Sequence, residues 1–235
     1  MAKIISVIVP TMWYANELFF KMLPLLEWSY AVGEIIIVDN NPKDCPHEEL
    51  AKHNKILRLP TKQNLFFNPS INLGAKVASN EILCFLNDDV IFDPRVFEFI
   101  AANFNDECGM ISPHPDYFNR PEENDELIKQ LHLNPLDKHP DGVGKNVDGF
   151  GCSMFVMKKN FEPVPSQLVH HFGDEFISKM QEKHGRVNQT LHNWTVITPM
   201  RVTTRRVPEV QQVINNDWSI ATQVFAEHGL PNPIR

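Results

Sequence analysis

Short apolar runs that stop abruptly at polar residues are the feature that most constrains the fold of this chain. Four runs share the pattern: residues 4–9, 34–38, 56–59 and 81–86. Segments with helical spacing lie between and after them, at residues 17–30 (despite a proline), 47–54, 69–80 and 94–103. Apolar strands that alternate with helices are typical of a parallel sheet with crossover helices. The sequence therefore predicts an α/β domain with a mostly parallel central sheet flanked by helices.

The second half of the chain is less regular. Further strands are expected at residues 110–112, 149–157 and 195–198. Further helices are expected at residues 122–133, 170–185 and 207–228, the last with a break near Asn215 and Asn216. Residues 113–147 are polar and rich in Pro and His, and a loop of that length usually serves as a lid or a binding loop.

Composition and charge exclude several classes of protein. The formal net charge of −7 argues against a chain that wraps nucleic acid, although RVTTRRV at residues 201–207 is a small basic cluster. Four scattered cysteines without a CxxC pair suggest neither a zinc site nor a disulfide framework, which fits a reducing cytoplasm. No stretch approaches the roughly 18 apolar residues of a spanning helix, so we expect no membrane insertion.

Polar side chains follow three of the predicted strands. Thr11, Asp39 and the adjacent Asp88 and Asp89 each come just after an apolar run. Ligands of parallel sheets bind at the carboxyl ends of the strands, where these side chains are expected to meet. Two neighbouring carboxylates repel each other, and burying them is unfavourable unless a cation is present. A bound cation is one explanation, and a solvated turn or a helix N-cap is the other.

The order of motifs along residues 4–200 resembles glycosyltransferase family 2, whose members have the nucleotide-sugar-binding GT-A fold. The resemblance rests on six segments: SVIVPT, EIIIVDNNP, NLFFNPSINLG, FLNDDV, GFGCSMFVMKK and GDEFISKMQEKHG. Three residues depart from the family pattern. Asn87 stands in place of the first Asp of a DxD motif, Phe66 in place of a Gly, and Gly173 where an acid often precedes the catalytic Asp.

The resemblance implies one GT-A catalytic domain over residues 1–200, followed by a C-terminal helical extension over residues 201–235. Within it, residues 1–112 would bind the nucleotide sugar and residues 113–200 the acceptor. The segment 113–147 and the C-terminal helix would form the acceptor side or an oligomer contact.

The implied activity is metal-dependent, inverting transfer of a sugar from a nucleotide-diphosphate sugar, with UDP the expected nucleotide, to a hydroxyl group. The implied donor-binding residues are Pro10, Thr11, Asp39, Asn64, Asn72 and Asp88. Mn²⁺ or Mg²⁺ would neutralise the diphosphate leaving group, held by Asp89 and Asp88 with His192 as a candidate third ligand.

A carboxylate near the acceptor hydroxyl would act as general base. Family spacing places it at Asp174, and the neighbouring Glu175 stays open as the alternative. The acceptor could be a glycan, a protein, a small molecule or a hydroxymethylated DNA base of the phage type. Two other functions stay open: a nucleotidyltransferase, and a non-catalytic protein that binds nucleotide sugars.

Overall fold

The structure is a computed structural model, and it describes residues 3–114, 117–118, 131–133, 150–191, 194–199 and 202–234. The segment 134–149 and most of 115–130 therefore lie outside the description, as do the predicted metal ligand His192 and Arg201 of the basic cluster.

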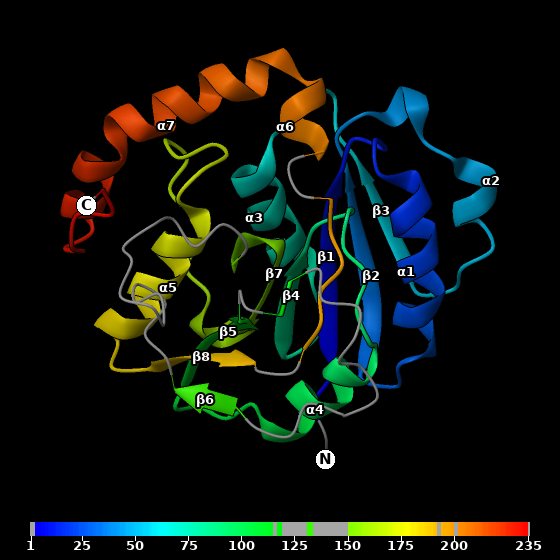
Figure 1. Cartoon of the computed structure of the whole chain (residues 1–235), viewed down its shortest axis with the longest axis horizontal. Coiled ribbons are helices and arrows are strands. Elements are labelled where there is room, and N and C mark those ends of the chain that lie inside the picture. The colour runs from blue at the N-terminus through cyan, green and yellow to red at the C-terminus, as the bar shows by residue number, and fades with distance from the viewer. Residues whose placement is uncertain are drawn as a thin grey trace.

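One twisted sheet organises the described part of the chain (Figure 1). Its strand order is β3-β2-β1-β4-β7-β5-β8-β6. The bounds of the strands are β1 Ile5–Thr11, β2 Val32–Asp39, β3 Ile56–Pro60, β4 Ile82–Leu86, β5 Cys108–Pro113, β6 Leu131–Leu133, β7 Ser153–Met157 and β8 Val187–Leu191. Strands β3, β2, β1 and β4 are parallel, as are β5 and β8, whereas β7 and β6 run antiparallel to their neighbours. The predicted mostly parallel α/β sheet is confirmed.

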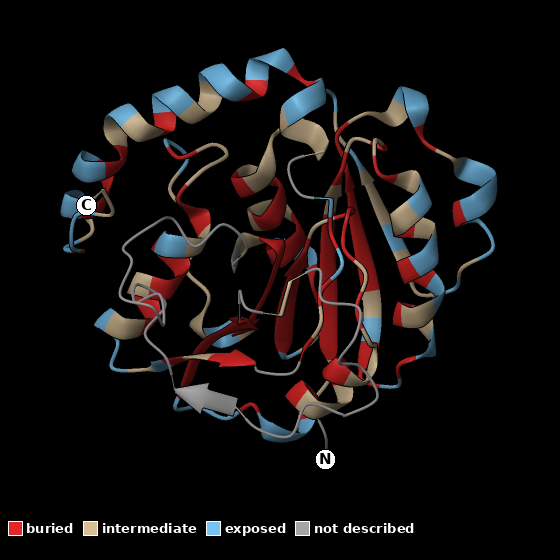
Figure 2. Cartoon of the chain, viewed as in Figure 1, coloured by how far each residue is buried: buried red, intermediate tan, exposed pale blue. Residues whose placement is uncertain are grey.

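Helices cover both faces of this sheet. Their bounds are α1 Asn16–Trp28, α2 His47–Leu50, α3 Phe67–Val77, α4 Arg95–Asn103, α5 Gly173–Lys183, α6 Val202–Arg206 and α7 Pro208–Glu227, with 3₁₀ turns η1 Pro42–Asp44, η3 Phe150–Cys152 and η4 Lys158–Asn160. Helices α1 and α4 pack on one face, and α3, α5 and α7 on the other. Successive residues of a strand point to opposite faces of the sheet, so Val7 and Ile8 of β1 pack in different apolar layers. Figure 2 shows the buried strands at the centre and exposed residues on the outer side of α7.

Three elements differ from the sequence-based expectations. The strand expected at residues 195–198 is wrong: Val196 and Ile197 form only isolated bridges, and the strand beside β5 is β8. The break expected in the last helix is also wrong, because α7 is continuous and Gln211 pairs with Asn215 on its exposed side. The end of the helix expected at residues 122–133 belongs to strand β6 instead, and residues 122–130 lie outside the described part.

Helix α7 contributes buried side chains to the apolar layer on one face of the sheet. Ala221, Val224 and Phe225 are buried in the same apolar layer as α3 and α5. Among the helices of the described ranges, none is both long enough and apolar enough to span a bilayer. The division of the chain at residue 200 stays a prediction.

Candidate active site

A cavity of about 490 Å³ lies at the carboxyl ends of β1 and β4. Loops that precede α3 and α5 form two further walls, and α6 and α7 line it as well. The cavity brings together seven of the predicted site residues: Pro10, Thr11, Asn64, Asp88, Asp89, Asp174 and Glu175. Residues from both halves of the chain therefore meet at the edge of the sheet where ligands of such folds bind.

Asp88 lies at the end of β4 and is 8% exposed. The Thr11 hydroxyl donates a hydrogen bond of 2.5 Å to its Oδ2, and the same hydroxyl oxygen accepts from the backbone N–H of Trp13 at 2.9 Å. Burial raises the pKa of Asp88 to about 7, and the charge of Asp89 adds to the rise, while the Thr11 hydrogen bond opposes it. The protein thus holds this carboxylate in surroundings that disfavour its charge.

Asp89 is 5% exposed, and its Oδ1 has no hydrogen-bond partner among the described residues. Burial raises the pKa of Asp89, against hydrogen bonds from the Val202 backbone and the side chains of Asn87 and Thr198. Asn87, the departure from the DxD pattern, therefore supports Asp89 as a hydrogen-bond donor. A buried carboxylate oxygen without a partner is rare in folded proteins, so Asp89 Oδ1 is suited to bind a ligand or an ion.

A hard divalent cation fits these two carboxylates. Among the described residues that line the cavity there is no Lys or Arg to neutralise them. Elsewhere in the described ranges, too, no three His, Cys, Asp or Glu side chains are grouped as a metal site would require. Mg²⁺ and ions like it are commonly bound by one or two carboxylates together with substrate phosphates, and Asp88 and Asp89 match that number of carboxylates.

The second pair of acids begins helix α5. Asp174 is partly buried and Glu175 is exposed. A Cβ atom added to Gly151 would lie 3.3 Å from Asp174 Oδ2, which places this carboxylate against the backbone of η3. A Cβ at Gly173 would lie 2.0 Å from Asn68 Oδ1, so no other residue fits there without displacing Asn68. This contact explains why Gly173 replaces the acid of the family pattern.

Two residues outside the predicted set hold the loop before α5. Asn68 of α3 donates from Nδ2 to the carbonyls of Leu168 (3.1 Å) and His171 (3.0 Å). Asp217 of α7 is 1% exposed, and its carboxylate accepts from the backbone N–H groups of Val169 (3.0 Å), His170 (2.7 Å) and His171 (2.7 Å). Asn68 stands inside the quoted NLFFNPSINLG segment, whereas no local sequence signal marks Asp217.

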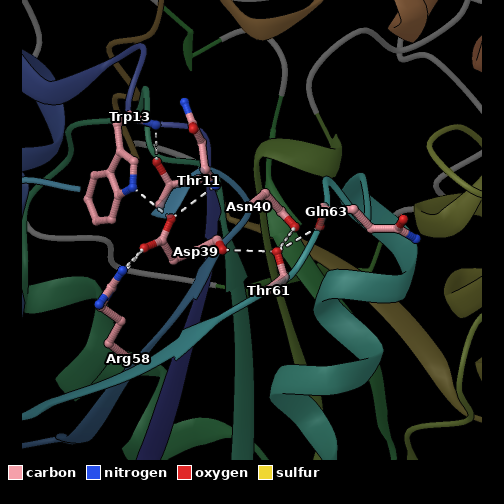
Figure 3. Close-up of polar contacts among 8 residues, drawn as sticks. Thr11, Trp13, Asp39, Asn40, Arg58, Thr61 and Gln63 are labelled. Atoms are coloured by element: carbon pink, nitrogen blue, oxygen red, sulfur yellow. Dashed lines mark hydrogen bonds and ion pairs between the residues drawn. The ribbon is translucent and has the colours of Figure 1, made fainter. Parts of the chain in front are cut away.

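Asp39 was expected to accept from the base or the ribose, and the structure does not bring it to the cavity with the other predicted residues. The residue is fully buried and does not line the cavity. Its Oδ1 accepts from Trp13 Nε1 (2.8 Å) and the Asn41 backbone (3.0 Å), and its Oδ2 accepts from Arg58 Nε (2.7 Å) (Figure 3). Because both oxygens are used within the protein, Asp39 joins the loop after β1 to strand β3.

Asn72 was also expected at the donor site, and it too lies outside the cavity lining. Its Nδ2 donates to the Val164 carbonyl at 2.8 Å, and its Oδ1 accepts from the Val164 N–H at 2.9 Å. The side chain therefore connects α3 to the segment before α5. Asn64 does line the cavity, where its Oδ1 accepts from the Phe66 N–H at 2.8 Å.

Phe66 adopts φ 61° and ψ −167°, a backbone conformation that glycine accepts far more readily than other residues. The Gly of the family pattern at this position is consistent with that requirement. Here the chain keeps an aromatic side chain that lines the cavity.

The sequence led us to expect the C-terminal helix on the acceptor side or at an oligomer contact, but it did not name the residues with which α7 lines the cavity. Val210, Gln211, Ile214 and Trp218 line it from this helix. His170 and His171 line it beside them, and burial lowers the pKa of His170 to about 4. The four-residue spacing of 210, 214 and 218 was the available signal, since it places these side chains on one face of the helix.

Comparisons with known proteins agree with this arrangement. The family model described as glycosyl transferase family 2 matches residues 6–163. A search of curated proteins by sequence found no match.

Many solved structures share the fold, and three of them serve as examples. GalNAc-T7 with UDP, GalNAc and Mn²⁺ has 11% identity and a TM-score of 0.62, and the match covers 84% of this chain and 43% of that one. S. aureus TarS 1-349 has 13% identity and a TM-score of 0.62, with 95% of this chain and 65% of that one covered. The mannosyltransferase PcManGT from Pyrobaculum calidifontis with GDP-Man and Mn²⁺ has 12% identity and a TM-score of 0.60, with 93% of this chain and 64% of that one covered. The chain thus spans less than two thirds of each of these proteins. The predicted GT-A fold is confirmed.

Proposed function

Because the chain belongs to glycosyltransferase family 2, we propose that it transfers a sugar from a nucleotide-diphosphate sugar to a hydroxyl acceptor. The observation that carries the proposal is the buried Asp88–Asp89 pair, with an unpartnered oxygen, in one cavity with Asp174. Two of the solved structures with this fold contain Mn²⁺ with UDP or GDP-Man, which supports a nucleotide-sugar donor here.

Asp89 is the first proposed ligand of Mn²⁺ or Mg²⁺, and Asp88 the second. A cation held there would neutralise negative charge that develops on the departing diphosphate. Thr11 orients Asp88 through its hydroxyl, so its proposed role is to position a ligand and shape the donor site together with Pro10 and Asn64. Asp39 and Asn72 are left out of the donor site, and His192 stays a prediction.

Asp174 is the proposed general base. It is held against Gly151 and is partly buried, whereas Glu175 is exposed, so Asp174 has the more defined position. A carboxylate in that role takes the proton of the acceptor hydroxyl, which contributes about 10²–10⁴-fold in rate. One base without a covalent partner leads to inversion at the anomeric carbon.

UDP is the proposed nucleotide. The four free, buried cysteines support a cytoplasmic location.

A donor screen tests the proposed function. The protein is incubated with Mn²⁺ and a panel of UDP- and GDP-sugars, and slow release of the nucleoside diphosphate is measured. We expect release from one donor that requires the cation and is lost in Asp89→Asn. A protein that binds the donor but releases nothing under any condition would instead be a non-catalytic binding protein, and release of pyrophosphate would indicate a nucleotidyltransferase.

A further inference from the structure

Helix α7 presents an apolar and aromatic row to the cavity. Val210, Ile214 and Trp218 are spaced by four residues, which places them on one face of the helix, and all three line the cavity. Figure 1 shows α7 along one edge of the molecule, running from α6 toward the C-terminus. Side chains from the last part of the chain thus form a wall of the cavity that holds the acids of β4 and α5.

Trp218 is held firmly within this wall. Its ring lies 4.8 Å from that of Phe172 at 70° and 5.8 Å from that of His171 at 37°. The preceding residue, Asp217, binds three backbone N–H groups of the loop before α5. The indole is therefore fixed against the loop that leads to Asp174, yet it is only partly buried and keeps surface toward the cavity.

The charge of the cavity restricts what can lie against that indole. Four carboxylates line the cavity, and its described lining contains no Lys or Arg. A cation on Asp88 and Asp89 would be shared with the donor diphosphate, which leaves Asp174 and Glu175 facing the acceptor. A second anion there would be repelled by these carboxylates.

We propose that the α7 wall is the acceptor subsite, that Trp218 is its platform, and that the acceptor is an uncharged sugar. This inference rests on the proposed function and names its acceptor. A pyranose ring offers an apolar face of C–H groups, which suits an aromatic surface, and its hydroxyls suit the few polar groups around it. A DNA acceptor would bring phosphates to an acidic cavity. Arg206, of the neighbouring basic cluster, donates to the Tyr14 carbonyl (3.1 Å) and stacks on the Tyr14 ring.

The test uses the full chain, Mn²⁺ and the donor found by the hydrolysis screen. Acceptors are neutral alkyl glycosides, the matching glucuronides, and duplex DNA that carries hydroxymethylcytosine. We expect transfer to a neutral glycoside and none to the other two. Trp218→Leu should raise the KM for that glycoside by about tenfold, and Trp218→Phe should restore most of the loss. Affinity for Mn²⁺–UDP, measured by calorimetry, should stay unchanged.

Two further variants separate the proposed subsite from the rest of the surface. Trp28→Leu is the matched control, since Trp28 is 68% exposed at the end of α1 and outside the cavity, and it should leave the acceptor KM unchanged. Gln211→Lys adds a positive charge at an exposed position of the cavity wall, so it should allow measurable transfer to the glucuronide, which the unaltered protein does not use.

Each contrary result has a distinct meaning. Transfer to the glucuronide or the DNA by the unaltered protein, or an acceptor KM that does not respond to Trp218→Leu, overturns the inference while leaving the glycosyltransferase intact. If no nucleotide sugar is hydrolysed at all, the proposed function itself fails.

Discussion

Two pairs of adjacent acids line the same cavity, and their surroundings differ. At the end of β4, Asp88 and Asp89 are 8% and 5% exposed, and burial raises the pKa of both. At the start of α5, Asp174 is partly buried and Glu175 is exposed. The residue types are nearly the same, so the difference lies in the burial that the fold imposes.

That difference assigns different chemistry to the two pairs. Two buried carboxylates side by side are stable as anions only when a positive charge lies close to both of them. A carboxylate that is accessible from the cavity can meet an acceptor hydroxyl, as a general base must. The buried pair, Asp88 and Asp89, is therefore suited to a cation, and the open pair, Asp174 and Glu175, to proton transfer.

The largest expected effect separates the two acids of the open pair. Asp174→Asn should lower kcat by at least about 100-fold, because the amide cannot take the proton of the acceptor hydroxyl. Binding of Mn²⁺–UDP, measured by calorimetry, should be unchanged. Glu175→Gln is the isosteric counterpart and should reduce kcat only a few-fold. If instead Glu175→Gln abolishes transfer and Asp174→Asn does not, the base is Glu175.

The next prediction concerns the buried pair. One substitution should weaken cation binding and, without the cation, raise the melting temperature. Asp89→Asn should weaken binding of Mn²⁺–UDP by about 100-fold, since it removes a proposed ligand. In the presence of EDTA at pH 8 the same variant should melt about 2–4 °C higher, because it removes a buried charge next to Asp88.

Calorimetry and thermal melts of the same preparation provide both readings. An unchanged affinity for Mn²⁺–UDP would place the cation elsewhere. A lower melting temperature with EDTA would mean that the Asp89 charge is already compensated within the protein, and the contrast between the two pairs would disappear.

A smaller effect concerns how the open pair is positioned. Asn68 and Asn72 lie one turn apart on α3, and each binds backbone groups of the segment before α5. Either change to Ala should lower the free energy of unfolding by about 1–3 kcal/mol, because buried backbone groups lose their partners.

Only one of these variants should alter catalysis. Asn68→Ala releases the loop next to Asp174 and should lower kcat by about tenfold, since small displacements of a catalytic group reduce the rate strongly. Asn72→Ala should leave kcat and the donor KM unchanged. Urea unfolding and steady-state kinetics measure the pair. A raised donor KM in Asn72→Ala would return Asn72 to the donor site.

The sequence predicted the first four strands well for a physical reason. They are buried on both faces, so they read as uninterrupted apolar runs. Strand β8 (VNQTL) was not predicted because three of its five residues are polar, and the fold nevertheless buries some of them. Asn188, for example, is 3% exposed and accepts from the Met110 N–H at 2.7 Å. Hydropathy alone does not reveal a partner that is distant in the sequence.

The same limit explains the outcome at the site. Thr11, Asp88 and Asp89 could be found because their position directly after a buried strand defines where they lie. Asp39 has the same signature, but its partners Trp13 and Arg58 occupy its oxygens, and the pattern does not distinguish these cases. Asp217 acts through backbone groups 46–48 residues away, for which the sequence carries no local sign.

The smallest expected effect concerns His170, and it tests whether a positive charge lies near Asp174 and Glu175. His170 lies on the loop before α5, and burial lowers its pKa to about 4 from an ordinary 6.5, helped by His171 and opposed by Asp217. Between these two pH values the unfolded chain holds a proton that the folded His170 rejects, so this residue lowers stability as the pH falls from about 7 to about 4.

His170→Gln removes that contribution. Its melting temperature should match the unaltered protein above pH 7 and exceed it by roughly 2–4 °C near pH 4.5. Thermal melts across this range, with His47→Gln at an exposed position as the control, provide the measurement. A variant that instead loses stability at neutral pH would show that His170 is charged there. The acids of α5 would then have a cation beside them, as the acids of β4 are proposed to have, and burial alone would no longer separate the two pairs.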